Sequence, residues 1–382
     1  PAAACSTGDG PAACPRCHLS RRALLVTALI CNLLPLLWFK YSGFFAHNLA
    51  ALLHVQWQFT PPGLPLGISF YTFIQIAWLV SVYRGQVRPA GLGRHLLFSS
   101  CFPYVISGPI VRYEQLGPQL DALHGSTAEG LARGFSLFTL GLVKKALLAD
   151  TLALWADAVF NAAEKGFPLS GAEAWLGSLC YTFQLYFDFS GYTDMALGLG
   201  LMLGLRLPEN FDSPYKSTGI VDFWRRWHIT LGAWLRDFLY IPLGGNRVSK
   251  SRLYFNLFVV WAATGFWHGA SWNFVFWGVY YGLLLLAEKF LLGRFLEKAP
   301  VWLRNLYTMF AVIIGWGFFS QTTPAAIGKM LGSMFGFGAS CFADRASLYA
   351  LKSGLILMII SVISCRPGLY QYFKRLARRN TY

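Results

Sequence analysis

Residues 253–292 read LYFNLFVVWAATGFWHGASWNFVFWGVYYGLLLLAEKFLL. Two apolar runs, 253–267 and 272–292, lie on either side of one histidine, His268. The second run has the length that an α-helix needs to cross the hydrocarbon core of a bilayer, and the first is somewhat shorter. This pattern predicts two membrane-embedded helices that meet at a titratable side chain.

The rest of the chain repeats the apolar pattern. Of its 382 residues, 55% are hydrophobic and 13% are charged, which is about half the charged share of a soluble domain. Only helices or closed barrels satisfy the backbone in lipid, and the runs lack the alternation of barrel strands. We therefore expect an all-α integral membrane protein with about eight to eleven embedded helices, some of them buried, tilted or re-entrant. The other apolar runs are 23–39, 64–83, 131–160, 172–187, 191–205, 305–319 and 346–365.

The positive charges lie between these runs. The net charge is +15, but Lys and Arg do not gather on one soluble segment, so nucleic acid is not the expected partner. Anionic lipid headgroups and an anionic cytosolic ligand fit this distribution better. If the basic clusters are cytoplasmic, the spans alternate sensibly with both termini inside.

The chain reads as one transmembrane domain over residues 21–382. We find no long hydrophilic block and no repeat of 20 to 50 residues. Residues 1–20 show no signal-peptide pattern and are expected to be a disordered or non-native lead-in. Residues 103–120 contain several helix breakers, which predicts either a re-entrant, broken segment or a helix end followed by an amphipathic loop.

Residues 221–239 predict one amphipathic helix at the membrane interface. Tryptophan and leucine fall on one side of its helical wheel and arginine and aspartate on the other. His228 lies where the two faces meet. It either takes part in chemistry or only hydrogen-bonds a neighbour.

Three further polar side chains interrupt apolar runs. His268 at membrane depth should be neutral and suits a general base; the alternative is a helix-end histidine in a Gly-rich hairpin. Asp188 and Asp194 lie in an apparent pair of apolar helices and need partners at that depth. For Asp188 we favour a role in a polar site. Asp194 either belongs to such a site or caps a helix that starts after Gly191.

Soluble-type catalytic signatures do not occur in the sequence. It contains no nucleophile elbow, Walker loop, zinc spacing or dinucleotide fingerprint, so we expect no bound metal and no tightly bound cofactor. What remains is a histidine base in a lipid-embedded cavity with a basic mouth suited to a phosphorylated donor.

Five stretches together resemble the membrane-bound O-acyltransferase family, in its alginate O-acetyltransferase-like branch. The longest is LPENFDSPYKSTGIVDFWRRWHITLGAWLRDFLYIPLGGNR, residues 207–247, and it is highly specific. The others are GFWHGASWNFVFWGVYYG (265–282), LPLGISFYTFIQIAWLVSVYRG (64–85), FPYVISGPIVRY (102–113) and YFDFSGYTDMALGLGLMLG (186–204). Two departures are a missing opening helix before residue 21 and a short C-terminal part, which we expect to affect stability or partner docking.

The resemblance implies a multi-helix bundle with re-entrant and interfacial helices around a central tunnel. His268 is implied to be the catalytic base and His228 the second active-site histidine. Members of this branch move acetyl groups from cytoplasmic acetyl-CoA across the membrane to an exopolysaccharide, often through a periplasmic acetyltransferase partner. Four residues match a family motif and are expected to bind substrate: Asp188, Ser190, Tyr192 and Asp194.

The chemistry assigns roles to further residues. A thioester is already activated, so positioning and removal of one proton are the main demands. Trp267, Asn273 or Tyr280 could steady the oxyanion, and Trp267 and Asn273 are expected to contact substrate. Four arginines are expected either to bind the donor phosphates or to act as positive-inside anchors: Arg225, Arg226, Arg236 and Arg247.

Three rival functions remain open. Within the family, the acceptor could be peptidoglycan or cellulose, or the cargo could be D-alanine for teichoic acid. In another class, His268 and Asp188 could serve a transporter of a small polar substrate, although no inverted repeat is visible. A non-catalytic scaffold would keep its function without the His268 imidazole.

Overall fold

The described part of the chain is built from helices and turns, with one isolated β-bridge between Phe211 and Trp227. A computed structural model describes residues 20–57, 59–123 and 125–366; the predicted lead-in lies almost wholly outside them. These residues fall into two compact units, one within Pro1–Cys101 and Arg112–Pro118 and the other within Phe102–Val111 and Gln119–Tyr382. The single domain expected over residues 21–382 stays a prediction.

The first unit holds the first two predicted runs as helices. The run at 23–39 is longer than expected, because a π-helical turn that follows Pro35 continues the helix to Leu52 instead of ending it. The run at 64–83 becomes helical only at Ile68, after Gly67 in the left-handed conformation with φ of 73°. The unit contains α1 (Arg21–Leu36), η1 (Leu37–Tyr41), α2 (Ser42–Leu52), α3 (Ile68–Tyr83) and α4 (Leu92–Ser99), and α1 packs on α3.

The second unit carries every residue that the sequence assigned to catalysis or binding. Its first elements are α5 (Phe102–Val105), α7 (Ala128–Val143), η2 (Lys144–Ala149), α8 (Asp150–Glu164), α9 (Gly171–Met202), η3 (Pro214–Lys216), α10 (Ile220–Arg226), α11 (Ile229–Leu235) and η4 (Arg236–Tyr240). They are followed by α12 (Lys250–His268), α13 (Trp272–Ala287), η5 (Glu288–Leu292), α14 (Gly293–Lys298), α15 (Val301–Ser320), α16 (Pro324–Met334) and α17 (Arg345–Ser364). The short helix α6 (Tyr113–Asp121) crosses the boundary between the units.

Helix α9 is one continuous helix, and the expected pair of helices at 172–187 and 191–205 is therefore wrong. A capping box starts it: Ser170 Oγ accepts from Glu173 N at 3.2 Å, and Glu173 Oε2 accepts from Ser170 N at 2.8 Å. The apolar pattern continues through Gly191, and the helix runs on for about three more turns to Met202 without a new cap. Asp194 consequently lies in the helix interior and caps nothing.

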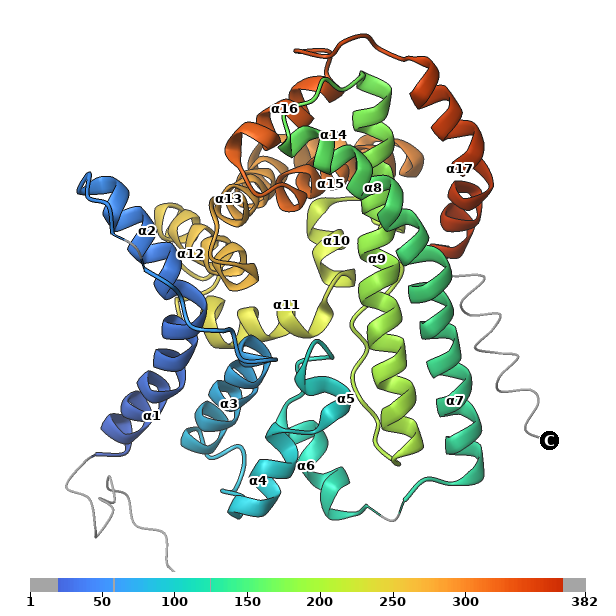
Figure 1. Cartoon of the computed structure of the whole chain (residues 1–382). Coiled ribbons are helices and arrows are strands. Elements are labelled where there is room, and N and C mark those ends of the chain that lie inside the picture. Colours follow the sequence, from blue (N-terminus) through green and yellow to red (C-terminus); the bar gives the residue numbers. More distant parts are fainter. Residues whose placement is uncertain (1–19, 58, 124, 367–382) are drawn as a thin grey trace, which may run out of the picture. The chain divides into compact units, whose positions relative to one another are not determined.

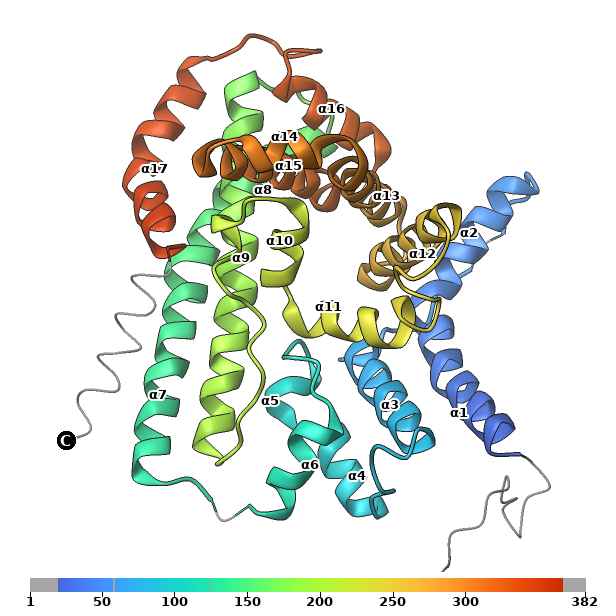
Figure 2. The same ribbon diagram turned by 180° about the vertical axis from the view of Figure 1, so that it is seen from behind.

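Glycines bring α7 and α9 into backbone contact, and both views show the two helices side by side (Figures 1 and 2). A Cβ built on Gly141 would lie 2.5 Å from the Gly191 carbonyl oxygen, and one on Gly191 would lie 2.7 Å from the Gly141 oxygen. Gly134 and Gly198 form the same reciprocal pair at 2.6 Å in each direction. Small residues spaced by seven thus form a seam, as in membrane helix pairs.

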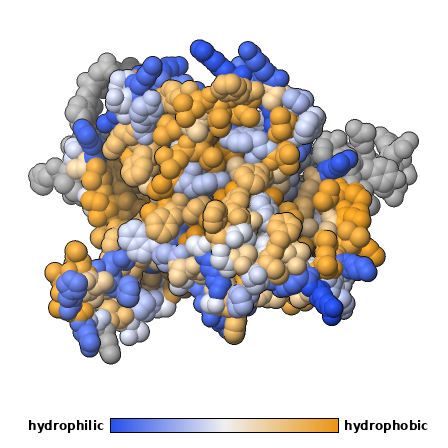
Figure 3. All heavy atoms as spheres, turned by 90° about the horizontal axis from the view of Figure 1, so that it is seen from above, coloured by the Kyte–Doolittle hydropathy of each residue, from blue (hydrophilic) through white to orange (hydrophobic). Residues whose placement is uncertain are grey.

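Among the described residues, four helical segments are long and apolar enough to cross a membrane: Arg21–Leu52, Trp272–Lys298, Val301–Ser320 and Arg345–Ser364. The shorter α3 is also apolar. Hydrophobic residues cover much of the face seen in Figure 3. The chain is thus all-helical in its described part with a membrane character, while the count of eight to eleven embedded helices stays a prediction.

The breaks expected in residues 103–120 are present. Helix α5 has only four residues, and the chain then runs without helix to α6 at Tyr113. The Ile110 N–H donates to Thr230 Oγ1 at 2.9 Å, which fixes this stretch beside α11. A re-entrant position in a bilayer stays a prediction, as does the central tunnel.

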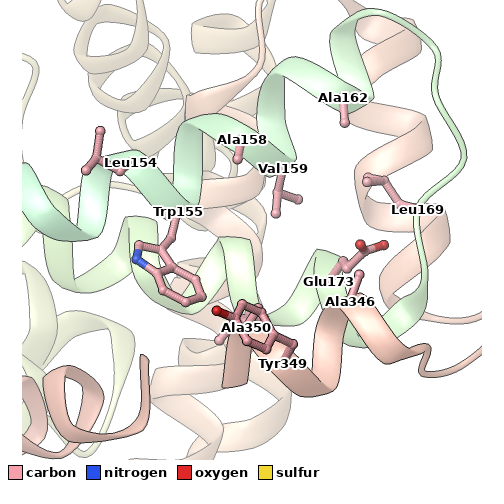
Figure 4. A pocket seen from close by; sticks show the side chains of 11 residues that line it. Leu154, Trp155, Ala158, Val159, Ala162, Leu169, Glu173, Ala346, Tyr349 and Ala350 are labelled. Carbon is pink, nitrogen blue, oxygen red and sulfur yellow. The ribbon is translucent and has the colours of Figure 1, made fainter. Parts of the chain in front are cut away.

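A separate apolar cavity of about 380 Å³ lies among α8, α9 and α17 (Figure 4). Trp155, Glu173 and Tyr349 are on its wall, together with small and aliphatic side chains. None of the residues predicted to act in catalysis or binding lines it.

Candidate active site

The chain turns sharply at His228. Helix α10 ends at Arg226, Trp227 is extended, and His228 adopts the left-handed conformation with φ of 46° and ψ of 55° before α11 begins. The single helix expected over 221–239 is therefore wrong. Backbone pairing with an earlier segment replaces it: Asp212 N donates to Arg226 O and Ile229 N to Asn210 O, both at 3.0 Å.

Left-handed backbone at a residue other than glycine costs about 1–2 kcal/mol, and such strain gathers at functional sites. His228 is 3% exposed, and its ring lies edge-on to Phe189 at 4.8 Å between centroids and to Trp267 at 5.9 Å. Neither ring nitrogen hydrogen-bonds another described residue, so the expected alternative of a neighbour-bonded histidine is wrong within that part of the chain.

The charge state of His228 follows from its burial. It lies outside the four candidate spans, and burial, with a smaller contribution from His268, lowers its pKa to about 3. The imidazole is therefore neutral near pH 7, with one nitrogen able to donate a hydrogen bond and the other able to accept one.

His268 is the last residue of α12 and is half-buried. Aromatic rings surround it: Trp267 at 4.9 Å, Trp277 at 5.1 Å and Phe319 at 5.2 Å between centroids, each close to perpendicular. The helix-end position agrees with the structural alternative, but its catalytic role stays a prediction. Gly269 allows the turn, since a Cβ there would lie 2.1 Å from Phe274 Cε2.

Trp267 connects the two histidines. It is the chain neighbour of His268, and its ring contacts that of His228. The two imidazoles also interact electrostatically. The structure thus brings together the two histidines and one tryptophan that the sequence singled out separately.

The two aspartates of α9 pair with consecutive lysines of η2. Lys144 Nζ lies 2.6 Å from Asp194 Oδ2, and Lys145 Nζ lies 2.6 Å from Asp188 Oδ1. The partners expected for these aspartates are therefore lysines. The sequence does not identify them, because each pair joins residues more than 40 positions apart.

The other two residues of that motif differ in their surroundings. The Ser190 hydroxyl is buried and hydrogen-bonds no other described residue. The Tyr192 side chain interacts with the backbone of Ser107. Phe189, which lies between Asp188 and Ser190 in the same motif, contacts the His228 ring.

Of the three suggested oxyanion donors, two are engaged with the backbone of α15. Asn273 Nδ2 donates to Phe319 O at 3.1 Å, and Tyr280 Oη donates to Ala311 O at 2.8 Å. Trp267 lies beside both histidines. These contacts favour Trp267 for a role close to the reacting atoms and give Asn273 and Tyr280 a part in joining α13 to α15.

Two further residues at the site, Trp277 and Tyr281, were not predicted from the sequence. Trp277 is fully buried, contacts the His268 ring, and its indole N–H hydrogen-bonds no other described residue. Tyr281, one turn later, is also fully buried, and its hydroxyl is likewise without a described partner. The spacing Asn273, Trp277, Tyr281 places all three on one face of α13 and could have identified them.

The four arginines are not equivalent. Arg226 contacts Asp212 and Asp222, each at 2.8 Å, and Arg236 contacts Asp237 at 2.7 Å. Arg225 and Arg247 are exposed. An acidic partner neutralises part of an arginine's attraction for phosphate, so Arg225 and Arg247 are better suited to a donor than the other two.

Known proteins share this chain's sequence over most of its length. A family model described as MBOAT, membrane-bound O-acyltransferase family, matches residues 24–323. The probable alginate O-acetylase AlgI of Pseudomonas aeruginosa is 40% identical over 92% of this chain and 68% of its own length. The peptidoglycan O-acetyltransferase of Helicobacter pylori is 38% identical over 83% of this chain and 65% of its own length.

A more distant relative is the teichoic acid D-alanyltransferase of Bacillus subtilis, which is 30% identical over 69% of this chain and 67% of its own length. The family model spans both histidines and the helices that hold them. The resemblance found in the sequence motifs is thereby confirmed. The chain belongs to the membrane-bound O-acyltransferase family, and it is an acyltransferase.

Proposed function

We propose that this protein is an O-acetyltransferase that takes an acetyl group from cytoplasmic acetyl-CoA and passes it across a bacterial inner membrane. The acetyl group is destined for an extracytoplasmic polysaccharide such as alginate, and a periplasmic acetyltransferase receives or relays it. The observation that carries the proposal is the pair of histidines around Trp267. One of them, His228, is buried and strained, and neither of its ring nitrogens hydrogen-bonds another described residue.

In the proposed reaction, the oxygen of an acceptor hydroxyl attacks the thioester carbonyl carbon. His268 takes the hydroxyl proton as the new C–O bond forms, the C–S bond breaks, and the proton ends on the departing sulfur as a thiol. Holding donor and acceptor in line supplies several kcal/mol of the rate enhancement. Neutral His228 or the Trp267 indole N–H donates to the developing oxyanion.

The binding of the donor is proposed to rest on charge. Arg225 and Arg247 are exposed basic residues on either side of α11, and they would attract the phosphates of CoA. Ser190 and Asn273 are proposed to contact the substrate, each through a buried oxygen without a described partner. Asp188, Tyr192 and Asp194 are proposed to shape this side of the site.

The acceptor is the open choice within the proposal. The alginate-related and peptidoglycan-related relatives are almost equally similar, at 40% and 38% identity, and the D-alanyl-transferring relative is less similar at 30%. Acetyl transfer is therefore favoured over D-alanyl transfer. The family match also favours an enzyme over a transporter or a scaffold.

The test is transfer of radiolabelled acetyl groups in membrane vesicles that contain this protein with or without its candidate polymer. Label should reach the polymer from acetyl-CoA, and His268→Ala should abolish this transfer while the variant still accumulates in the membrane. A His268→Ala variant that acetylates the polymer at the wild-type rate would refute the catalytic assignment. Label that moves only from a D-alanyl donor would refute the acetyl assignment.

A further inference from the structure

Glu288 is a buried carboxylate that the proposed reaction does not use. It is 8% exposed and begins the π-helical turn η5 at the end of α13. Its Oε1 accepts from Ile220 N at 2.6 Å, and its Oε2 accepts from Val221 N at 3.3 Å. These are the first two residues of α10, so a side chain from a distant segment satisfies the free N–H groups of that helix.

The local sequence cannot provide this cap. Gly219 occupies the position before α10 and has no side chain to accept a hydrogen bond. A Cβ on Gly219 would lie 3.4 Å from Glu288 Oε1, in direct contact with the carboxylate. The glycine thus leaves the helix start open to Glu288.

Side chains of α15 hydrogen-bond to the turn at residues 215–218, just before α10. Arg304 donates from Nε and Nη2 to the carbonyl and hydroxyl oxygens of Thr218 at 3.3 and 3.2 Å. Asn305 Nδ2 donates to the carbonyl oxygens of Tyr215 and Ser217, each at 2.9 Å. Arg304 also interacts electrostatically with Glu288. Charged and amide side chains of two candidate membrane spans therefore fix the entry to α10.

Helix α10 carries this constraint to the active site. It has only seven residues, so a shift at its start moves its end as a rigid body. His228 follows two residues after that end. Within α10, the Trp224 ring packs edge-on against Tyr281 and Trp277 of α13, at 4.8 and 5.5 Å between ring centroids.

Helix α13 is linked to the other histidine. It begins at Trp272, four residues after His268, and its Trp277 contacts the His268 ring. At its far end lies Glu288. The two histidines are thus joined through α13, Glu288 and α10, in addition to their contact through Trp267.

We propose that Glu288 is a positioning residue: it fixes α10 on α13 and thereby sets the place of the His228 ring relative to His268. The functional importance of this placement rests on the proposed acetyl transfer. Glu288 itself does not touch the reacting atoms. A misplacement of about 1 Å remote from the chemistry can lower a rate by about 100-fold, which makes such an anchor consequential.

The test compares Glu288→Ala, which removes both hydrogen bonds, with Glu288→Gln, which keeps one acceptor oxygen in the same volume. Gly328→Ala is the control, because Gly328 lies in α16 and no atom outside its own helix and chain neighbours comes within 4 Å of its built Cβ. Two measurements are made on each folded variant. One is kcat and KM for acetyl-CoA; the other is the rate at which diethyl pyrocarbonate modifies His228, followed by mass spectrometry.

Glu288→Ala should lower kcat at least about tenfold with KM within about twofold, since the histidines are displaced and the donor site is untouched. It should also raise the modification rate of His228 at least about fivefold, and Glu288→Gln should restore both values most of the way. Gly328→Ala should leave the modification rate near that of wild type.

An unchanged modification rate of His228 in both Glu288 variants would overturn the inference. The modification rate reports the placement of the ring and not acetyl transfer. If His228→Ala proves active, the proposed catalytic role of His228 fails, but a faster modification in Glu288→Ala still upholds the anchoring by Glu288. The two failures are therefore distinguishable.

Discussion

The glycine seam between α7 and α9 permits a quantitative prediction for Gly141→Ala. The added Cβ would lie 2.5 Å from Gly191 O, 2.7 Å from Met195 N and 2.9 Å from Met195 Cγ. Two of these three atoms belong to the backbone of a packed helix, so a rotamer change cannot relieve the clash. The helices must separate, and overpacking of this kind destabilises by about 1–3 kcal/mol.

Two further terms decide the net effect. Alanine favours the helix over glycine by about 1 kcal/mol, which offsets part of the clash. Separation also stretches the ion pair between Lys144 and Asp194, which now measures 2.6 Å and is largely buried. A broken buried pair is strongly destabilising, so the net loss should be about 1–2 kcal/mol or more.

Gly328→Ala is the matched control for this prediction. Gly328 lies within α16, and no atom outside its own helix and chain neighbours comes within 4 Å of its built Cβ. Its substitution should therefore stabilise the protein by up to about 1 kcal/mol through helix propensity alone. Unfolding by SDS titration in mixed micelles measures both changes. The seam is refuted if Gly141→Ala is as stable as wild type while Gly328→Ala gains the expected stability.

Four other predictions concern the site and α17. His268→Ala should lower kcat for acetyl transfer by about 10²–10⁴-fold, the usual contribution of a general base, in a variant that runs as a folded species on size exclusion. His228 has its pKa lowered to about 3 by burial, so stability is full above the ordinary value of 6.5 and falls below it, as the unfolded ring binds a proton that the folded ring does not. His228→Gln should flatten that acid decline in the unfolding free energy, and a decline identical to wild type would contradict the buried neutral ring. Asp344→Ala removes the N-cap of α17 and should cost about 1 kcal/mol near pH 7, measured by the same titration. A hydrogen bond from the backbone of the capping box lowers the pKa of Asp344, so this difference should vanish as the pH falls through that pKa. Arg225→Ala combined with Arg247→Ala should raise KM for acetyl-CoA several-fold at low salt and less at high salt, because screening weakens the attraction; a salt-independent KM would count against phosphate binding.

The sequence by itself determined the class of the protein, and it predicted which residues are central to the site. Long apolar runs with few charges and without the alternation of barrel strands are stable in lipid only as helices. The all-α membrane character could therefore be predicted from the sequence. The two histidines could be singled out as candidate site residues because a titratable ring within an apolar run rarely serves packing alone. The family motifs added the acyltransferase activity, which the comparisons confirm.

Only the tertiary structure decided how these parts meet. Helical periodicity continued through residues 221–239, yet pairing of Trp227 with Phe211 breaks the helix and strains His228, since a hydrogen-bonded partner distant in sequence outweighs local pattern. The lysines that neutralise Asp188 and Asp194, and the carboxylate that caps α10 from 68 residues away, depend equally on contacts between remote segments. Sequence patterns show which face of a segment is apolar. They do not show which polar side chain of another segment will contact it, because that depends on how the helices pack.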